Sequence, residues 1–287
     1  MFVISGVTGN TGSIAAQTLI NNGQSVRVIV RSEEKGTPWK AKGAEVAIAD
    51  IMDTGAMTKA LQGATGAYFL LPPDLSNDTF IDESIKRAEA IISAATTARL
   101  PHAVILSSVG AQHGDRVGPI STIAYLEQLF VKASIPLSAV RPGYFLENIQ
   151  DVMPAVNHEG IYPTMILPLD FEIDMVATKD IGLTVAEALL NPPSKPHRVI
   201  ELKGARQYSA KDIAAVLSRS LNRKITPVAV PQEGWVDQLK QSGLSQQSAE
   251  SIAEMYENIN NGRISFLDPH AKKGTIDLNT FVNELVA

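Results

Sequence analysis

Short apolar runs alternate with segments of helical spacing through the first half of the chain. Several of these runs, above all residues 66–71, are apolar throughout rather than on alternate positions. Strands of this kind are typical of a parallel sheet that helices cover on both faces. The pattern therefore predicts an α/β fold with a doubly wound parallel sheet. Its strands are expected at 1–4, 24–31, 44–50, 66–71, 102–108 and 136–143, and its helices at 13–20, 37–43, 54–62, 80–99 and 121–133.

The alternation becomes irregular beyond Tyr144. Residues 148–168 contain prolines, a glycine and a histidine without a clear period, which suits a lid over a substrate. Next, we expect a helix at 178–190 capped by Thr178. A strand at 198–202, a helix at 209–221, a strand at 224–228 and two helices across 234–260 complete a smaller α/β carboxyl-terminal part. We expect a nucleotide-binding domain at 1–150, to which 172–200 return, and a substrate-binding or lid region at 151–287.

Three glycines follow the first strand at intervals of three residues. Gly6 suits a backbone conformation closed to other residues, Gly9 lets the main chain approach a pyrophosphate, and Gly12 lets the helix lie against the strand. A glycine triplet alone can be a simple turn, but here a strand precedes it and a helix and a second strand follow it. This setting predicts a Rossmann-type dinucleotide site. Its phosphate contacts are expected from Gly6, Thr8, Gly9, Asn10, Thr11 and Gly12.

The end of the second strand indicates which dinucleotide binds. An acidic residue there would bind the ribose of NAD, whereas an arginine accommodates the 2′-phosphate of NADP. The chain has Arg31, with Lys35 and Lys42 as potential helpers. The alternative is that Arg31 is simply a solvated side chain. Glu33 lies close enough to the strand end to leave NAD binding open. We therefore favour NADP(H) over NAD(H).

Further cofactor contacts are expected where other strands end, because ligands of open α/β sheets bind at that edge. Asp50 and Ile51 follow the third strand at the expected adenine position, although Asp50 can equally be an ordinary charge at a helix start. Leu71 and Pro72 begin a turn-rich loop after the fourth strand. Ser107 ends the fifth strand beside the expected nicotinamide, where a backbone-bonded hydroxyl is the alternative.

Composition narrows the function classes. The chain has 287 residues, is 45% hydrophobic and carries a net charge of −5 with its charges interspersed, so nothing favours a nucleic-acid surface. It has no cysteine, which excludes disulfides and thiolate chemistry. No histidine or carboxylate cluster has metal-ligand spacing, no apolar run is long enough for a bilayer, and no signal peptide precedes the first strand. A cytoplasmic protein without a metal is the simplest interpretation.

A more specific run follows the sixth strand. Arg141-Pro142-Gly143-Tyr144-Phe145-Leu146-Glu147-Asn148, together with the glycine motif, Leu106-Ser107-Ser108, Glu127 and residues 176–182, resembles the NmrA-like branch of the atypical short-chain dehydrogenases. Within that branch the chain is most similar to the group of quinone oxidoreductase type 2 and triphenylmethane reductase. The resemblance covers essentially the whole chain. It implies an NAD(P)-binding Rossmann fold, a soluble oxidoreductase and, on family grounds, a homodimer.

The acid–base pair of typical short-chain dehydrogenases is absent. They use a tyrosine and a lysine four residues later, and no tyrosine of this chain has such a lysine. Alignment on Glu127 puts Pro119 and Ile123 at those two positions, and Lys132 lies at the wrong end of the helix. Alcohol and ketone chemistry is therefore disfavoured. Hydride transfer to a quinone or a similar planar conjugated acceptor needs little help from an enzymic acid.

The substrate-pocket candidates follow from this interpretation. Tyr144 and Phe145 would form an aromatic wall and Asn148 would bind an acceptor oxygen, with core packing and helix capping as the alternatives. His113 lies in a loop that can reach substrate, whereas His102 is expected at the surface. The rival function is a non-catalytic regulator that senses NADP(H) and binds a protein partner. The sequence thus predicts an NADPH-dependent quinone reductase and leaves the sensor open.

Overall fold

A computed structural model describes residues 1–286 and contains one eight-stranded sheet whose neighbouring strands all pair in parallel. The first six strands of the chain take the order β3-β2-β1-β4-β5-β6, which confirms the doubly wound prediction. Across the sheet the strands are β13 (Lys272–Lys273), β10 (His197–Lys203), β6 (Leu137–Pro142), β5 (Ala103–Leu106), β4 (Gly66–Phe69), β1 (Phe2–Ile4), β2 (Val26–Val30) and β3 (Glu45–Ile48).

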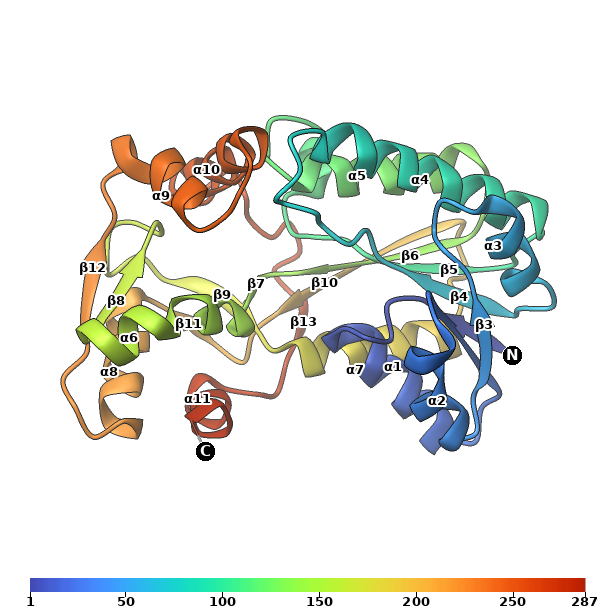
Figure 1. Cartoon of the computed structure of the whole chain (residues 1–287), viewed down its shortest axis with the longest axis horizontal. Coiled ribbons are helices and arrows are strands. Elements are labelled where there is room, and N and C mark those ends of the chain that lie inside the picture. Colours follow the sequence, from blue (N-terminus) through green and yellow to red (C-terminus); the bar gives the residue numbers. More distant parts are fainter. Residues whose placement is uncertain (287) are drawn as a thin grey trace.

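Helices cover both faces of this sheet (Figure 1). On one face lie α1 (Asn10–Asn21), α2 (Glu33–Ala41) and α7 (Thr178–Leu190), and on the other lie α3 (Thr54–Leu61), α4 (Phe80–Thr97) and α5 (Ile120–Lys132). Gly182 allows α7 to approach α1 closely, because a Cβ atom at this position would come within 2.6 Å of the Ile14 Cβ atom. The two layers hold the carboxyl ends of the strands in fixed positions.

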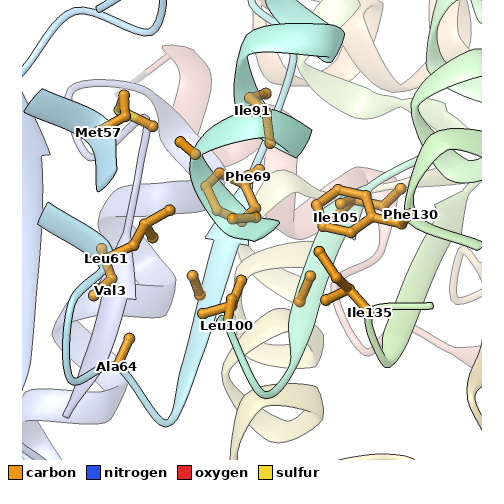
Figure 2. Packing of buried hydrophobic residues seen from close by; sticks show 14 of the residues in the cluster. Val3, Met57, Leu61, Ala64, Phe69, Ile91, Leu100, Ile105, Phe130 and Ile135 are labelled. Carbon is orange, nitrogen blue, oxygen red and sulfur yellow. The ribbon is translucent and has the colours of Figure 1, made fainter. Parts of the chain in front are cut away.

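Consecutive strand residues enter opposite cores, as the apolar runs predict. Val3 and Ile105 join the core beneath α3, α4 and α5, while Ile4 joins the core beneath α1 and α7. Figure 2 shows the first core, where Phe69 of β4 packs against Phe130 of α5 with a ring-centroid distance of 6.0 Å. Strands buried on both faces give the sheet a rigid interior.

A smaller lobe lies beyond one end of the main sheet (Figure 1). It contains a three-stranded sheet, a two-stranded sheet and a core of its own. Its strands are β7 (Tyr144–Phe145), β8 (Ile161–Thr164), β9 (Ile173–Val176), β11 (Gln207–Tyr208) and β12 (Thr226–Ala229). Its helices and 3₁₀ turns are η2 (Leu146–Val152), α6 (Met153–Glu159), α8 (Ala210–Ser220), η3 (Gln232–Gly234), α9 (Trp235–Gln241), α10 (Gln246–Asn260) and α11 (Leu278–Val286), while η1 (Ala111–His113) precedes α5.

The chain passes between the two parts more than once. After β9, α7 packs on the main sheet and β10 and β13 extend it, whereas β11 pairs with β9 in the lobe. The limits of the expected domains stay a prediction. Because the chain crosses between the sheet and the lobe more than once, the two parts are connected at several points.

Some local expectations were wrong. The second helix begins at Glu33 rather than residue 37, since Ser32 and two glutamates provide a favourable start. Ala177, not Thr178, occupies the N-cap of α7, and the side chain of this N-cap residue makes no capping hydrogen bond. His102 is buried, with 2% of its surface exposed. Residues 148–168, expected to be irregular, contain most of η2 and all of α6 and β8, whereas their role as a lid stays a prediction. No helix within residues 1–286 is both long and apolar enough to cross a membrane.

Candidate functional site

The glycine motif forms a tight turn between β1 and α1. Gly6 has a φ of +66°, in the left-handed region that favours glycine. Gly12 is buried, and a Cβ atom there would come within 2.5 Å of the Gly6 carbonyl oxygen. Near Gly9, in contrast, only the Gly6 carbonyl oxygen lies within reach, at 3.5 Å from a Cβ atom. The side of the loop at Gly9 is therefore open for a group that approaches the main chain.

The amino end of α1 provides the positive potential for such a group. Gly9 is its N-cap, no side chain caps the helix and its first turn contains no acidic residue. Unpartnered backbone N–H groups and the helix dipole favour an anion at this position. The loop thus has the shape and the polarity of a phosphate cradle.

A cleft of about 430 Å³ runs from the loop over the ends of β2, β3 and β4. Gly6 and Thr8 line it on one side and Arg31 on the other, and Lys35 is close to Arg31. Within residues 1–286 the Arg31 side chain makes neither an ion pair within 4.0 Å nor a hydrogen bond, and it is exposed. Its guanidinium is available to an anionic ligand.

The other expected contacts of the cleft are placed as follows. Asp50, Ile51 and Pro72 line it, but Leu71 packs against the core beneath it and does not. The Asp50 carboxylate accepts a hydrogen bond of 2.9 Å from the Met52 amide, so it also stabilises the turn before α3. Sequence reasoning missed Arg87, which lines the cleft and pairs with Glu83 at 2.9 Å.

A second hollow, of about 310 Å³, lies on the other side of the glycine loop. Asn10 and Thr11 of α1 face Phe145 and Asn148 across it. The Thr11 hydroxyl is hydrogen-bonded to the Tyr68 hydroxyl at 2.9 Å, and the Thr11 backbone N–H belongs to the first turn of α1. The structure therefore brings the first helical turn and the motif after β6 together, although they are far apart in the sequence.

The wall of this hollow is fixed by Glu147. Its carboxylate accepts hydrogen bonds from the Thr178 amide, at 2.9 and 3.1 Å, and from the Thr178 hydroxyl. The residue that sequence reasoning placed as a helix cap thus joins the start of α7 to η2. This bond holds Phe145 and Asn148 beside the glycine loop.

Ser107 is part of a buried network rather than a free hydroxyl. It donates to Glu127, which forms a bidentate ion pair with Arg141 at 2.6 and 2.9 Å. All three residues are buried. The network ties α5 to the ends of β5 and β6, so the hydroxyl that is partly accessible at the strand end is that of Ser108, the next residue.

A groove of about 300 Å³ opens beyond Ser108 and Gly143, where the sheet meets the lobe. One wall carries Tyr144, and α10 contributes apolar side chains. Phe171 and Phe266 are its other aromatic residues. The full lining is Ser108, Val109, Ile120, Gly143, Tyr144, Phe171, Glu172, Ile173, Asp174, Lys203, Gln207, Met255, Ile259, Gly262, Ile264, Ser265 and Phe266. The apolar and aromatic residues of this lining suit a flat conjugated molecule, and Glu172, Asp174 and Lys203 add charged groups to it.

Residues 261–277, which we term the C-terminal strap, line the groove at Gly262, Ile264, Ser265 and Phe266. The strap is held by buried carboxylates without cationic partners among residues 1–286. Glu201 accepts bonds of 2.7–3.1 Å from the amides of Leu267 and Asp268, and Asp180 accepts from those of Thr275 and Ile276. These bonds keep Phe266 in the groove wall.

Protonation of the tyrosines beside the groove follows from their burial. Burial raises the pKa of Tyr144, and hydrogen bonds with Tyr256 and Asn148 offset part of this effect. The pKa of Tyr256 is raised further, by burial and then by Tyr144. Burial also raises the pKa of Asp151. Both phenols therefore stay neutral well above pH 7.

His113 is not brought to the groove. It lines a separate surface hollow of about 490 Å³ between α4 and α5, and its Nε2 atom lies 2.7 Å from the Arg263 carbonyl oxygen. This bond ties η1 to the strap. Within residues 1–286 no group of three or more histidine, aspartate or glutamate side chains is arranged to hold a metal ion.

Sequence reasoning singled out Ser107 rather than Ser108 at the end of the fifth strand, and it missed Lys203, Tyr256 and Phe266. Met255 and Ile259 are spaced four residues apart on α10, a signal of one apolar helix face, but nothing local shows what that face meets.

Known proteins resemble this chain over almost its full length. An NAD(P)H azoreductase of Xenophilus azovorans is 23% identical over 257 residues, covering 89% of this chain and 86% of the relative. A crystal structure of the NADPH-dependent quinone oxidoreductase of Escherichia coli with NADPH has a TM-score of 0.85 at 22% identity and covers all of both chains. The Citrobacter sp. triphenylmethane reductase with NADP(H) has a TM-score of 0.84 at 20% identity, with 99% of each chain covered. The NmrA-like family model matches residues 1–280, so the chain belongs to the NmrA-like family.

Proposed function

We propose that this protein is an NAD(P)H-dependent reductase that uses NADPH to reduce a quinone or a similar planar conjugated acceptor. The family, the glycine cradle and the relatives described as azoreductase and quinone oxidoreductase support this role. The observation that carries it is the glycine loop, whose residues line both the cleft that contains Arg31 and the hollow that contains Phe145 and Asn148. Tyr144, the residue before Phe145, lines the aromatic groove.

The cofactor would be held by the residues around the loop. The amides at the start of α1 would bind the pyrophosphate, and Gly9 would let it approach. Arg31 and Lys35 would bind the 2′-phosphate, because both line the cleft and Arg31 makes no ion pair with the described residues. When bound, NADPH supplies the hydride.

The protein itself contributes to the reaction by positioning the acceptor and by excluding water. Phe145 and Asn148 lie beside the glycine loop, and Tyr144 faces the groove. These residues would hold a flat acceptor against the reduced nicotinamide, which is catalysis by orientation. Pro119 and Ile123 replace the usual acid–base pair, so acceptors that do not require an enzymic proton suit the site.

The test is NADPH oxidation by the purified protein with simple quinones, followed at the absorbance band of reduced nicotinamide. We expect turnover that prefers NADPH to NADH, and we expect Arg31→Asp to lower the NADPH affinity by about 10- to 100-fold. The same substitution should leave the NADH affinity nearly unchanged, which makes NADH the internal control. Tight NADPH binding without oxidation in the presence of every quinone would reject the reductase and favour the sensor. The homodimer stays a prediction.

A further inference from the structure

We infer that Tyr144, positioned by Tyr256, donates a hydrogen bond to the acceptor atom that becomes negative during reduction. The groove is then selective for acceptors that turn into anions when they take a hydride, such as quinones, over cationic dyes. This inference rests on the proposed reductase function and defines the substrate class of the same site.

The two tyrosines meet between the groove and the lobe. Their hydroxyl oxygens are 2.9 Å apart and their ring centroids 6.4 Å apart. Tyr144 directly follows Gly143 at the end of β6 and lines the groove with Ser108. Tyr256 comes from α10, more than one hundred residues later in the sequence. The pair therefore exists only because the lobe folds back onto the end of the sheet.

Tyr256 is itself held by a rigid neighbour. Trp235 packs edge-on against its ring at a centroid distance of 6.1 Å. Trp235 is 1% exposed, and its indole N–H donates to the Val230 carbonyl oxygen at 2.8 Å. A hydroxyl fixed in this way needs little reorientation when charge develops beside it. This preorganisation is the condition for electrostatic stabilisation in a site.

One hydroxyl hydrogen of the tyrosine pair is not used in the bond between the two residues. Two neutral hydroxyls contain two hydrogens, and their mutual bond uses only one of them. If Tyr256 donates to Tyr144, the Tyr144 proton is left to point at a ligand. Since burial keeps both phenols neutral, the pair can donate to an anion without first losing a proton.

The charge balance of the two reactions differs. When a quinone takes a hydride, the C–H bond of the dihydronicotinamide breaks, and the two electrons leave a hydroquinone monoanion with its charge on oxygen. Tyr144 would stabilise that oxygen, and water then supplies the proton. A triarylmethane cation takes the same hydride at its central carbon and becomes neutral. No anion forms on the dye, so the hydroxyl has nothing to stabilise.

The decisive experiment compares Tyr144→Phe with the wild type on a quinone and on a triarylmethane dye. Phenylalanine keeps the ring and removes only the hydroxyl. We expect kcat/KM for the quinone to fall about 10- to 100-fold, and that for the dye to change by less than about threefold. If the wild type accepts no cationic dye, a series of quinones replaces the dye in this comparison. The loss should then grow as the quinone becomes a weaker electron acceptor, because its oxyanion is more basic.

Two further variants separate positioning from general damage. Tyr256→Phe should reduce the quinone rate less than Tyr144→Phe, and the double variant should be no worse than Tyr144→Phe alone, since both act through one hydroxyl. Tyr162→Phe is the matched control. Tyr162 is a buried tyrosine next to Tyr144 that does not line the groove, so its variant should keep the wild-type ratio of quinone to dye.

Equal losses on the quinone and the dye, or a uniform loss along the quinone series, would overturn the role of Tyr144 and leave the reductase function standing. Additive losses in the double variant would overturn the role of Tyr256. A wild-type protein that reduces no acceptor would overturn the proposed function and this inference together.

Discussion

The cleft and the groove lie at the same edge of the sheet, but the chain builds them in opposite ways. The cleft is lined by the ends of successive strands within the first 87 residues, from Ser5 to Arg87. The groove draws its lining from segments between Ser108 and Phe266, on both the sheet and the lobe. The cleft is therefore a product of local strand–turn–helix units. The groove depends on contacts between distant segments, and the C-terminal strap that lines it is held by hydrogen bonds from backbone amides.

The cleft and the groove are also held in shape by different interactions. Gly6, Gly9 and Gly12 shape the cleft through backbone conformation alone. In the groove, Glu201 binds main-chain N–H groups of another segment. A carboxylate bound by several amides is stabilised without a counterion, and it fixes a loop that has little packing of its own. Substitutions should therefore affect the two regions separately, except where one network joins them.

The largest effect is expected from Glu127→Gln, which breaks the network at the junction of the two regions. The substitution leaves the buried Arg141 guanidinium without its counterion. We expect a loss of about 3–5 kcal/mol in the free energy of unfolding, measured by urea denaturation. Because Glu127 ties together the ends of β5 and β6, the variant should also weaken both NADPH and acceptor binding.

Glu187→Gln is the matched control for this prediction. Glu187 pairs with Lys272, but its side chain is 64% exposed. Solvent screens such a pair, so we expect a change below about 1 kcal/mol. Similar losses in the two variants would show that the buried network contributes no more than a surface pair.

The next effect separates two glycines of one motif. In Gly12→Ala the new Cβ atom would come within 2.7 Å of backbone atoms of Ser5 and Gly6, so we expect a loss of about 1–3 kcal/mol in stability. In Gly9→Ala the same atom would make only an ordinary contact, 3.5 Å from the Gly6 carbonyl oxygen, so it should leave stability nearly unchanged while reducing NADPH affinity. Urea denaturation and nucleotide titration of both variants distinguish the two effects. Destabilisation by Gly9→Ala would contradict the open cradle.

The same contrast explains what the sequence could predict. Gly6 and Thr8 of the glycine loop lie with Arg31, Asp50 and Pro72 in consecutive βα units, where periodicity and spacing define the geometry, and these five residues line one cleft. Tyr144 was identified by its motif. Its partner Tyr256 was not, because no local pattern reveals which segment packs on a given helix face.

His113 and Ser107 show a second limit. Both are close in sequence to the site, yet each is engaged by a distant partner: His113 by the Arg263 carbonyl oxygen and Ser107 by Glu127. Sequence proximity to a strand end indicates a location. It does not show which side chain remains free after the distant segments have packed.

A smaller effect, confined to the groove, is expected from Glu201→Gln. The amide side chain keeps one acceptor oxygen and loses the charge that binds the amides of Leu267 and Asp268. We expect a loss of about 1–2 kcal/mol in stability. The strap should loosen around Phe266, so KM for the acceptor rises while the NADPH dissociation constant stays the same. A change in NADPH binding of similar size would contradict the separation of the two regions.

An effect of comparable size concerns pH and lies at the opposite edge of the sheet from both regions. His102 is buried, its Nε2 atom lies 3.1 Å from the Ser138 hydroxyl, and burial and then the Arg198 charge lower its pKa to about 4. An unfolded histidine has a pKa of about 6.5, so between these values the unfolded chain binds a proton that the folded chain does not. Stability should therefore fall as the pH drops from about 6.5 toward 4.

The His102 contribution to this fall should be about 1–2 kcal/mol after allowance for solvent screening. His102→Gln should flatten the dependence of the urea midpoint on pH, whereas His270→Gln, which removes an exposed imidazole, should retain the wild-type slope. An unchanged slope in His102→Gln would show that the imidazole becomes charged without leaving its site. At neutral pH neither variant should change the NADPH affinity or the KM for the acceptor, because the pH-sensitive contact supports the sheet from its far edge.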